Sequence, residues 1–353
     1  MPSSRAAKPS GSRVRVLVVD DSLVAREMLR HILSSDTGIE VVATAADGAE
    51  AVELTATLRP DLVTMDIHMP RMDGIEAIER IMAYTPTPVL VVSSSVHGEG
   101  VGRAFDALAC GALEVVLKPA PRDWEALDEI ARDLVRRVRV LSQVRVITHV
   151  RGRRTRGRAI APGAGARSRS VVAIGASTGG PSALRTVLGG LPAAFPASVL
   201  VAQHIADGFI PGLVEWLDAA CSIRVRVAEE GAVLEPGVAY VAPTGRDLAL
   251  DGRAIRLAKP GSGQVHAPSA DVLFEGVARV HGASAVGVLL TGMGADGAAG
   301  LRALRDAGAA TIAQDEATSV VFGMPRAAIE LGAAERVLPL PEIAAAVAGL
   351  VAP

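Results

Sequence analysis

Short apolar runs rich in β-branched residues recur along this chain, and each leads into an amphipathic stretch. The runs in the first 147 residues are Val14–Val19, Ile39–Ala43, Leu62–Met65, Val89–Val92 and Leu113–Leu117. Their length and composition predict strands, and stretches such as Leu23–Leu33 and Ile75–Ala83 predict helices between them. Five β-α units in series predict a doubly wound parallel sheet with helices on both faces.

A second β-α series begins at Ser170. Its clearest strands are Val171–Gly175, Ser198–Gln203, Ala239–Ala242 and Val286–Thr291, and its predicted helices are Pro181–Leu188, Pro211–Ala220 and Ala298–Ala307. Aromatic residues make up only 3% of the 353 residues, so aliphatic side chains must fill the cores, as in buried parallel sheets. The fold class is therefore α/β, with two doubly wound parallel-sheet domains joined by a linker.

Composition sets the domain boundaries. We interpret residues 1–12, rich in Ser, Pro, Arg and Lys, as a flexible tail, 13–133 as the first domain, and 170–353 as the second. Residues 134–169 are rich in Arg and contain no Asp or Glu, which indicates a linker whose first part could extend the preceding helix. A nucleic-acid-binding arm is the alternative, but no aromatic residues are interleaved for base stacking.

Charge, hydropathy and cysteine content exclude other classes. The formal net charge is −2, and no apolar run approaches the roughly 20 residues that a membrane helix requires. The two cysteines, Cys110 and Cys221, are too far apart for a disulfide framework or a metal-ligand motif. We expect a cytoplasmic monomer that neither binds nucleic acid nor inserts into membranes.

Acidic and polar residues follow four strands of the first series. Asp20 and Asp21 follow the first strand, Asp66 the third, Ser93 the fourth and Lys118 the fifth. These strand ends meet at the edge where ligands bind in open α/β sheets. Each acid alone could be a loop or capping residue, but three crowded carboxylates favour a Mg²⁺ site. Asp66 could then attack a phosphoryl group, and Ser93 and Lys118 suit the added oxygens.

The second series opens with "VVAIGASTGGPSALRTVL", which predicts a strand, a glycine-rich turn and a helix. Ser177 lies in the turn, where unpaired backbone N–H groups favour an anion. The glycines do not form the dinucleotide fingerprint and no Walker lysine follows. A phosphate-binding turn with a structural serine therefore stays open on this segment alone.

Two further residues favour a hydrolase. His204 follows the strand Ser198–Gln203, and Asp296 follows Val286–Thr291, so both converge with Ser177 on one rim. A Ser-His-Asp set predicts a nucleophile, a general base and an orienting acid. Alone, His204 could be a surface residue and Asp296 the cap of the following helix.

Other residues complete this prediction. Glycines around Thr178 and Met293 would let backbone N–H groups approach an oxyanion. The remaining histidines show no evident partners and are interpreted as structural or solvated: His31, His97, His149, His266 and His281.

Over residues 14–119, the segments "LVVDDS", "MDIHMPRMDG", "VVSSS" and "LKP" resemble the receiver domain of bacterial response regulators. The resemblance implies a flavodoxin-like fold and phosphorylation of Asp66 by a CheA-type histidine kinase. It also implies a Mg²⁺ site built by Asp21, Asp66 and the backbone carbonyl of His68, next to Asp20. Val115 stands where the family usually has an aromatic residue, three positions before the lysine.

Over residues 170–350, "IGASTGGPSAL", "VAQHIADGFIPGL", "VAPTGRDLAL", "APSADVLFEGVA", "LLTGMGADGAAGL" and "AQDEATSVVFGMPRAAIELGA" resemble the catalytic domain of CheB methylesterases. The resemblance implies a Rossmann-like domain with the triad Ser177, His204 and Asp296, and with Thr178 and the Met293 backbone near the oxyanion. Ala267 stands where the family commonly has Arg.

The resemblance also implies an activity and its control. The reactions would be hydrolysis of glutamate γ-methyl esters on methyl-accepting chemotaxis receptors, releasing methanol, and deamidation of receptor glutamines, without a cofactor for the esterase. We hypothesise that the unphosphorylated receiver blocks the Ser177 rim and that phosphorylation of Asp66 relieves this inhibition. Two alternatives are a receptor-binding output domain without catalysis and a transcriptional regulator acting through the basic linker.

Overall fold

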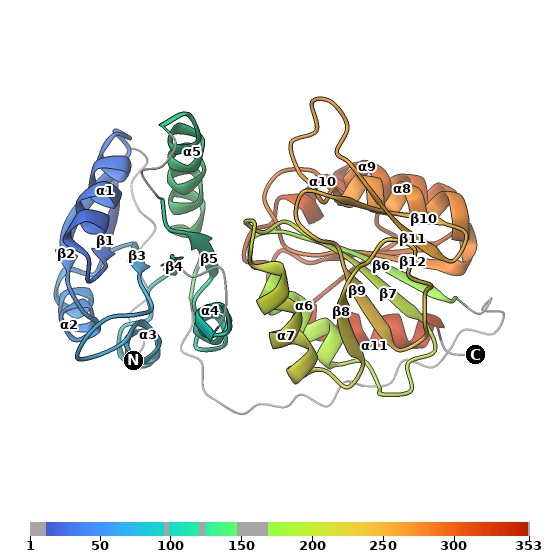
Figure 1. The fold of residues 1–353 in the computed structure, drawn as a ribbon, viewed down its shortest axis with the longest axis horizontal. Coiled ribbons are helices and arrows are strands. Elements are labelled where there is room, and N and C mark those ends of the chain that lie inside the picture. The colour runs from blue at the N-terminus through green and yellow to red at the C-terminus, as the bar shows by residue number, and fades with distance from the viewer. Residues whose placement is uncertain (1–11, 95–98, 120–123, 147–168, 352–353) are drawn as a thin grey trace. The chain divides into compact units, whose positions relative to one another are not determined.

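The computed structural model describes residues 12–94, 99–119, 124–146 and 169–351 (Figure 1). The predicted tail up to residue 11 and the linker over residues 147–168 lie outside these ranges. The chain divides into two compact units, which are described separately below. Within the described ranges, no helix is both long enough and apolar enough to cross a membrane.

The first unit contains a five-stranded parallel sheet with the order β2-β1-β3-β4-β5. Its strands are β1 (Val14–Val19), β2 (Ile39–Ala45), β3 (Leu62–Met65), β4 (Val89–Ser93) and β5 (Glu114–Leu117). The helices along this part of the chain are α1 (Leu23–Ser34), α2 (Gly48–Leu58), α3 (Gly74–Tyr84), α4 (Glu99–Ala109) and α5 (Trp124–Leu141). The predicted doubly wound sheet is confirmed.

Local sequence signals set the helix starts. Ser22, Asp47 and Asp73 stand in extended backbone at the N-caps of α1, α2 and α3, and each side chain accepts a hydrogen bond from a backbone N–H of the first turn. The helices α1 and α5 pack together, as do α2 and α3. Because the strand order reverses between β1 and β3, a crevice opens at their carboxyl ends.

The arginines that begin the predicted linker belong to α5, which continues to Leu141. Arg137 pairs with Glu114 of β5, and Arg139 Nη2 lies 2.6 Å from Asp36 Oδ1, just after α1. These ion pairs hold α5 against its own domain. This part of the arginine run therefore extends the helix, as the sequence allowed for the first part of the linker.

The second unit contains a seven-stranded parallel sheet with the order β14-β13-β12-β6-β7-β9-β8. Its strands are β6 (Val171–Ala176), β7 (Ser198–Gln203), β8 (Arg224–Val227), β9 (Val238–Val241), β12 (Ala285–Leu289), β13 (Ala310–Gln314) and β14 (Arg336–Leu338), and β10 (Asp247–Asp251) and β11 (Ala254–Ala258) form an antiparallel hairpin. The helices are α6 (Gly180–Gly189), α7 (Ile210–Ala220), α8 (Ala270–His281), α9 (Ala298–Asp306), α10 (Met324–Glu330) and α11 (Leu340–Val351), with a 3₁₀ turn, η1 (Gly282–Ser284).

Helices cover both faces of this sheet. In Figure 1, α6, α7 and α11 lie on one face, and α8, α9 and α10 lie on the other together with the hairpin. The sequence predicts the four central strands but not β8, β13 or β14 towards the edges, nor the hairpin. The chain leaves β6 towards β7 on one side and returns at β12 on the other, so the order reverses between β6 and β12. That reversal positions the crevice of this domain at the carboxyl end of β6.

Candidate functional site

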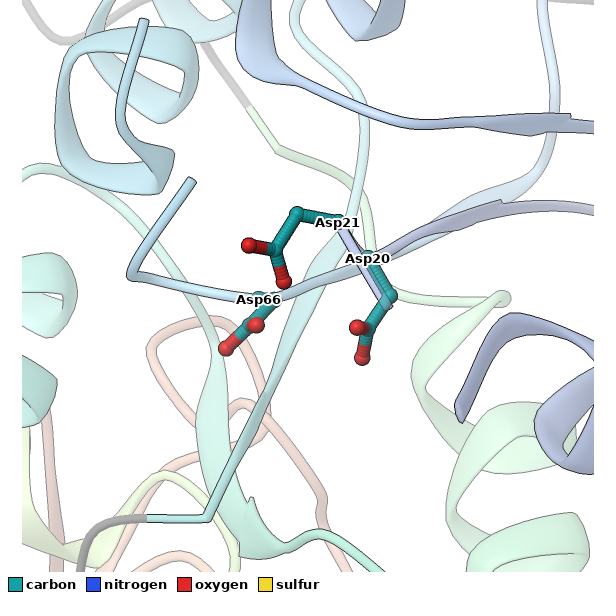
Figure 2. A group of neighbouring side chains, drawn as sticks. All are labelled: Asp20, Asp21 and Asp66. Carbon is teal, nitrogen blue, oxygen red and sulfur yellow. The ribbon is translucent and has the colours of Figure 1, made fainter. Parts of the chain in front are cut away.

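The three acids predicted in the first domain meet at the carboxyl edge of its sheet. Carboxylate oxygens of Asp20, Asp21 and Asp66 lie within 4.8 Å of one another (Figure 2). Lys118 reaches them from the end of β5, with Nζ 2.7 Å from Asp20 Oδ2 and 2.9 Å from Asp66 Oδ2. Ser93 ends β4, buried, and its carbonyl accepts a hydrogen bond from the Lys118 N–H.

The charges in this pocket are incompletely balanced. Burial raises the pKa of Asp20, Lys118 lowers it in part, and the neighbouring Asp66 charge raises it further. Burial opposes the charge of Lys118, but its hydrogen bonds to both acids raise its pKa overall. One ammonium thus faces three carboxylates, an oxygen-rich set that suits a hard cation such as Mg²⁺. His68 is exposed two residues after Asp66, in the loop that follows β3.

In the second domain, Ser177 and His204 follow neighbouring parallel strands. Ser177 comes directly after β6, and its N–H donates to the Thr291 carbonyl at 3.0 Å. His204 comes directly after β7, and its N–H donates to the carbonyl of Ala176 at 2.9 Å. Both therefore lie at the crevice where the strand order reverses, with Ser177 buried at 8% exposure.

The predicted base and acid form a direct pair. His204 Nε2 lies 2.8 Å from Asp296 Oδ2, and the two side chains are only 9% and 13% exposed. The other ring nitrogen, Nδ1, is buried and has no hydrogen-bond partner among the described residues. A neutral imidazole that donates from Nε2 keeps its lone pair on Nδ1, the nitrogen left to accept a proton.

Asp296 lies at the amino terminus of α8. Oδ2 accepts the N–H of Ala270 at 2.7 Å, and Oδ1 accepts the Ser269 hydroxyl at 2.8 Å and the Asp271 N–H at 3.2 Å. Burial alone would raise the pKa of Asp296, but the His204 and α8 hydrogen bonds lower it well below its usual range. The alternative, that Asp296 caps the following helix α9, is wrong, because its carboxylate accepts backbone N–H groups at the start of α8 instead.

Gln203 joins the serine and the histidine, and sequence reasoning missed it. Its side-chain Nε2 donates to the carbonyl of Ser177 at 2.9 Å and to that of His204 at 2.8 Å. The side chain is buried, and a Cβ at Gly180 would lie 2.0 Å from its Oε1. Gly180 is therefore required for this contact. The only signal in the sequence is a polar residue at the carboxyl end of a strand whose central residues are all apolar.

The two predicted oxyanion segments lie beside Ser177. The buried Thr178 accepts a hydrogen bond at its carbonyl from Thr291 Oγ1 at 2.9 Å. Met293 lies in the loop after β12, next to Gly292, where an added Cβ would lie 2.7 Å from the Cβ of Ser177. This loop therefore packs directly against the turn that carries the serine.

A second histidine contacts the pair. The ring of His266 is stacked on that of His204, with centroids 4.3 Å apart and planes inclined by 17°. The interpretation of His266 as a residue without a partner is therefore wrong. Nothing in the local sequence indicates the contact, because it depends on how the segment before α8 folds back over the rim.

Comparison with known proteins identifies the family. Residues 172–347 match the CheB methylesterase family, and residues 16–130 match the response regulator receiver domain. A protein-glutamate methylesterase/protein-glutamine glutaminase 2 of Anaeromyxobacter dehalogenans (strain 2CP-C) is 50% identical over 94% of this chain and 95% of its own length. A protein-glutamate methylesterase/protein-glutamine glutaminase 1 of Syntrophus aciditrophicus (strain SB) is 46% identical over 96% of this chain and 100% of its own length.

The chain belongs to the CheB methylesterase family. The crystal structure of the Thermotoga maritima CheB methylesterase catalytic domain also matches, with 36% identity and a TM-score of 0.50, over 52% of this chain and 100% of that one. The match of residues 16–130 to the receiver domain agrees with this membership, as do the sequence motifs described above for both domains.

Two departures from the family pattern are placed by the structure. Val115 is buried within β5. Ala267 precedes Pro268 through a cis peptide bond, and its carbonyl accepts the N–H of Gly245 at 3.0 Å.

An open cleft of about 800 Å³ lies beside the pair, between the segment before α8 and the end of α10. Asp296 and His266 line it on the side of the pair, and Val265 and Leu331 are exposed at its walls.

Proposed function

We propose that this chain hydrolyses glutamate γ-methyl esters on methyl-accepting chemotaxis receptors, and that it deamidates receptor glutamines at the same site. The observation that carries the proposal is the buried His204–Asp296 pair beside the Ser177 turn, at the reversal of strand order. The activity named for relatives of 50% and 46% identity supports it.

The geometry of the His204–Asp296 pair supports the following mechanism. Ser177 Oγ attacks the side-chain carbonyl carbon while His204 Nδ1 takes its proton, and Asp296 stabilises the imidazolium. Backbone N–H groups at Thr178 and Met293 would stabilise the oxyanion of the tetrahedral intermediate. Collapse breaks the bond to methoxide or to the amide nitrogen, which leaves with the proton of His204 as methanol or ammonia. Water then hydrolyses the acyl-enzyme to glutamate.

In the receiver, Asp66 would take a phosphoryl group from a CheA-type histidine kinase. Mg²⁺ would be held by Asp20, Asp21 and Asp66 with the carbonyl of His68, and it would neutralise charge on the incoming phosphoryl group. Ser93 and Lys118 would then bind phosphoryl oxygens. Phosphorylation would raise the esterase rate by relieving inhibition by the receiver.

Methanol release from a methylated receptor, with and without a small phosphodonor, tests the proposal. The wild-type chain should release methanol, and Ser177→Ala should release none. Ser182→Ala is the matched control, because Ser182 lies one turn further along, within α6, and should leave the rate unchanged. Methanol release by Ser177→Ala at the wild-type rate would refute the nucleophile, and a wild-type chain without activity would refute the function.

A further inference from the structure

The segment that precedes α8 places an aromatic ring on the face of the catalytic histidine. The His266 and His204 rings are nearly parallel, at 17°, with centroids 4.3 Å apart. In such a stack the nitrogens of His266 lie in a plane parallel to the His204 ring, so they do not point at its nitrogens. His266 therefore acts on His204 through contact between ring faces, not as a proton relay.

Hydrogen bonds fix His266 in this place. Gln264 Nε2 donates to the His266 carbonyl at 2.6 Å and to both carboxylate oxygens of Asp247 at 2.8 Å. Asp247 is buried at the start of β10 and also accepts the N–H of Ser269, the N-cap of α8, at 2.8 Å. The buried Asp247 carboxylate thus holds the Gln264 side chain, which bonds the His266 carbonyl, and the backbone N–H of Ser269 on the other side of His266.

A single hydrogen bond does not fix the orientation of an imidazole. The Nε2 bond to Asp296 positions one ring atom of His204, but the ring plane still tilts about that atom. A rigid ring on its face removes this freedom. Because a misplacement of about 1 Å at a reacting group costs on the order of 10²-fold in rate, the plane of His204 has direct consequences for proton transfer.

We propose that His266 is a positioning residue for the general base, holding the plane of His204 so that Nδ1 stays in line with the Ser177 hydroxyl. The inference rests on the proposed esterase function and adds a residue to it. An aromatic ring is what this role requires, and phenylalanine should therefore replace histidine. A role in binding substrate would instead depend on the imidazole nitrogens and would affect KM.

Kinetics of His266→Ala and His266→Phe in the full chain, with phosphodonor present, test the proposal. We expect His266→Ala to lower kcat by about tenfold, a part of the roughly 10²–10⁴-fold contribution of general acid–base catalysis, with KM unchanged. His266→Phe should restore most of kcat. His281→Ala is the matched control, because His281 is also partly buried but lies at the far end of α8, and it should leave kcat unchanged.

Titration of Ser177 with a fluorophosphonate probe counts the folded active sites, so that a loss of kcat is not confused with a loss of folded protein. Rates are expressed per labelled serine, so an unfolded fraction does not lower the apparent kcat. The labelling rate should fall with kcat in His266→Ala and recover in His266→Phe. An unchanged kcat in His266→Ala, an increase in KM alone, or equal losses in both variants would overturn the positioning role. A wild-type chain that neither labels nor releases methanol would instead overturn the esterase function.

Discussion

His204 contacts Asp296 through Nε2, at 2.8 Å, and not through Nδ1. In the chymotrypsin arrangement the acid binds Nδ1 and the base acts through Nε2. In the proposed mechanism the two nitrogens of His204 exchange these roles, because Nε2 is the atom that contacts Asp296. The expected base is therefore the buried Nδ1.

Replacing the acid by its amide should disable the base. In Asp296→Asn the site loses the negative charge that would stabilise the His204 imidazolium, and the NH₂ cannot accept the hydrogen bonds that one carboxylate oxygen receives from the start of α8. We expect kcat to fall on the order of 10³–10⁴-fold with little change in KM. Ester kinetics check this, with the exposed Asp306→Asn of α9 as control. Equal rates for the two variants would contradict the role of Asp296.

The free energy of unfolding, measured as a function of pH in acid, should depend on the protonation of the Asp296 carboxylate. The pKa of Asp296 is lowered from its ordinary value of 3.8, since hydrogen bonds from His204 and α8 outweigh its burial. The unfolded state thus holds this proton more tightly than the folded state, and the charged form stabilises the fold. That contribution is complete above pH 3.8 and is lost as pH falls through the lower folded value.

Comparison of wild type with Asp296→Asn isolates this contribution. The difference in free energy of unfolding, measured by urea denaturation of the catalytic unit, should be largest above pH 3.8 and should shrink at lower pH. A difference that grew on acidification would show that Asp296 does not favour its charged form in the fold.

How far the sequence predicts the site depends on how each residue is held. Ser177, His204 and Asp296 follow recognisable strands, and parallel strands bring their carboxyl ends together whatever the details of packing. Gln203 and His266 act through side-chain contacts that are set by a close approach at Gly180 and by the hydrogen bonds of Asp247. No pattern in the chain signals such contacts. Two of the strands that the sequence does not predict, β8 and β14, are short and partly exposed, so their apolar patterns are weak.

We expect Gln203 to be required to hold the backbone of Ser177 and that of His204 at a fixed distance from each other. Gln203→Met retains the approximate volume but leaves two buried carbonyls without the donor that joins them. We expect a loss of about 1–3 kcal/mol in stability and a clear fall in kcat. Gln314→Met is the control, because Gln314 is equally buried at the end of β13 but bonds neither Ser177 nor His204.

Thermal melting and ester kinetics of both glutamine variants separate fold from activity. Both variants should melt at lower temperature, but only Gln203→Met should lose kcat disproportionately. If Gln203→Met and Gln314→Met lose stability and kcat to the same extent, the hydrogen bonds of Gln203 do not position the catalytic residues.

Gly292 should tolerate no side chain. A Cβ there would lie 2.2 Å from Met324 Sδ and 2.7 Å from the Cβ of Ser177, so the serine or the loop must move. We expect Gly292→Ala to lower kcat by roughly 10²-fold, as a displacement near 1 Å does. Gly189→Ala is the control, since its nearest contact would be an ordinary 3.6 Å. Labelling of Ser177 in Gly292→Ala at the wild-type rate would rule out the displacement.

Asp66 should control the esterase without taking part in it. Asp66→Asn removes the carboxylate that would carry the phosphoryl group, so a small phosphodonor with Mg²⁺ should no longer raise methanol release, while the basal rate persists. Removing Mg²⁺ with EDTA should have the same effect on wild type, because the pocket of Asp20, Asp21 and Asp66 would then lack its cation.

Residues 170–353 alone provide the control. This fragment should be insensitive to the phosphodonor and to EDTA, and it should be faster than the unphosphorylated full chain if the receiver inhibits the esterase. Stimulation that survives in Asp66→Asn would place the phosphoacceptor elsewhere, and equal rates for fragment and full chain would exclude inhibition.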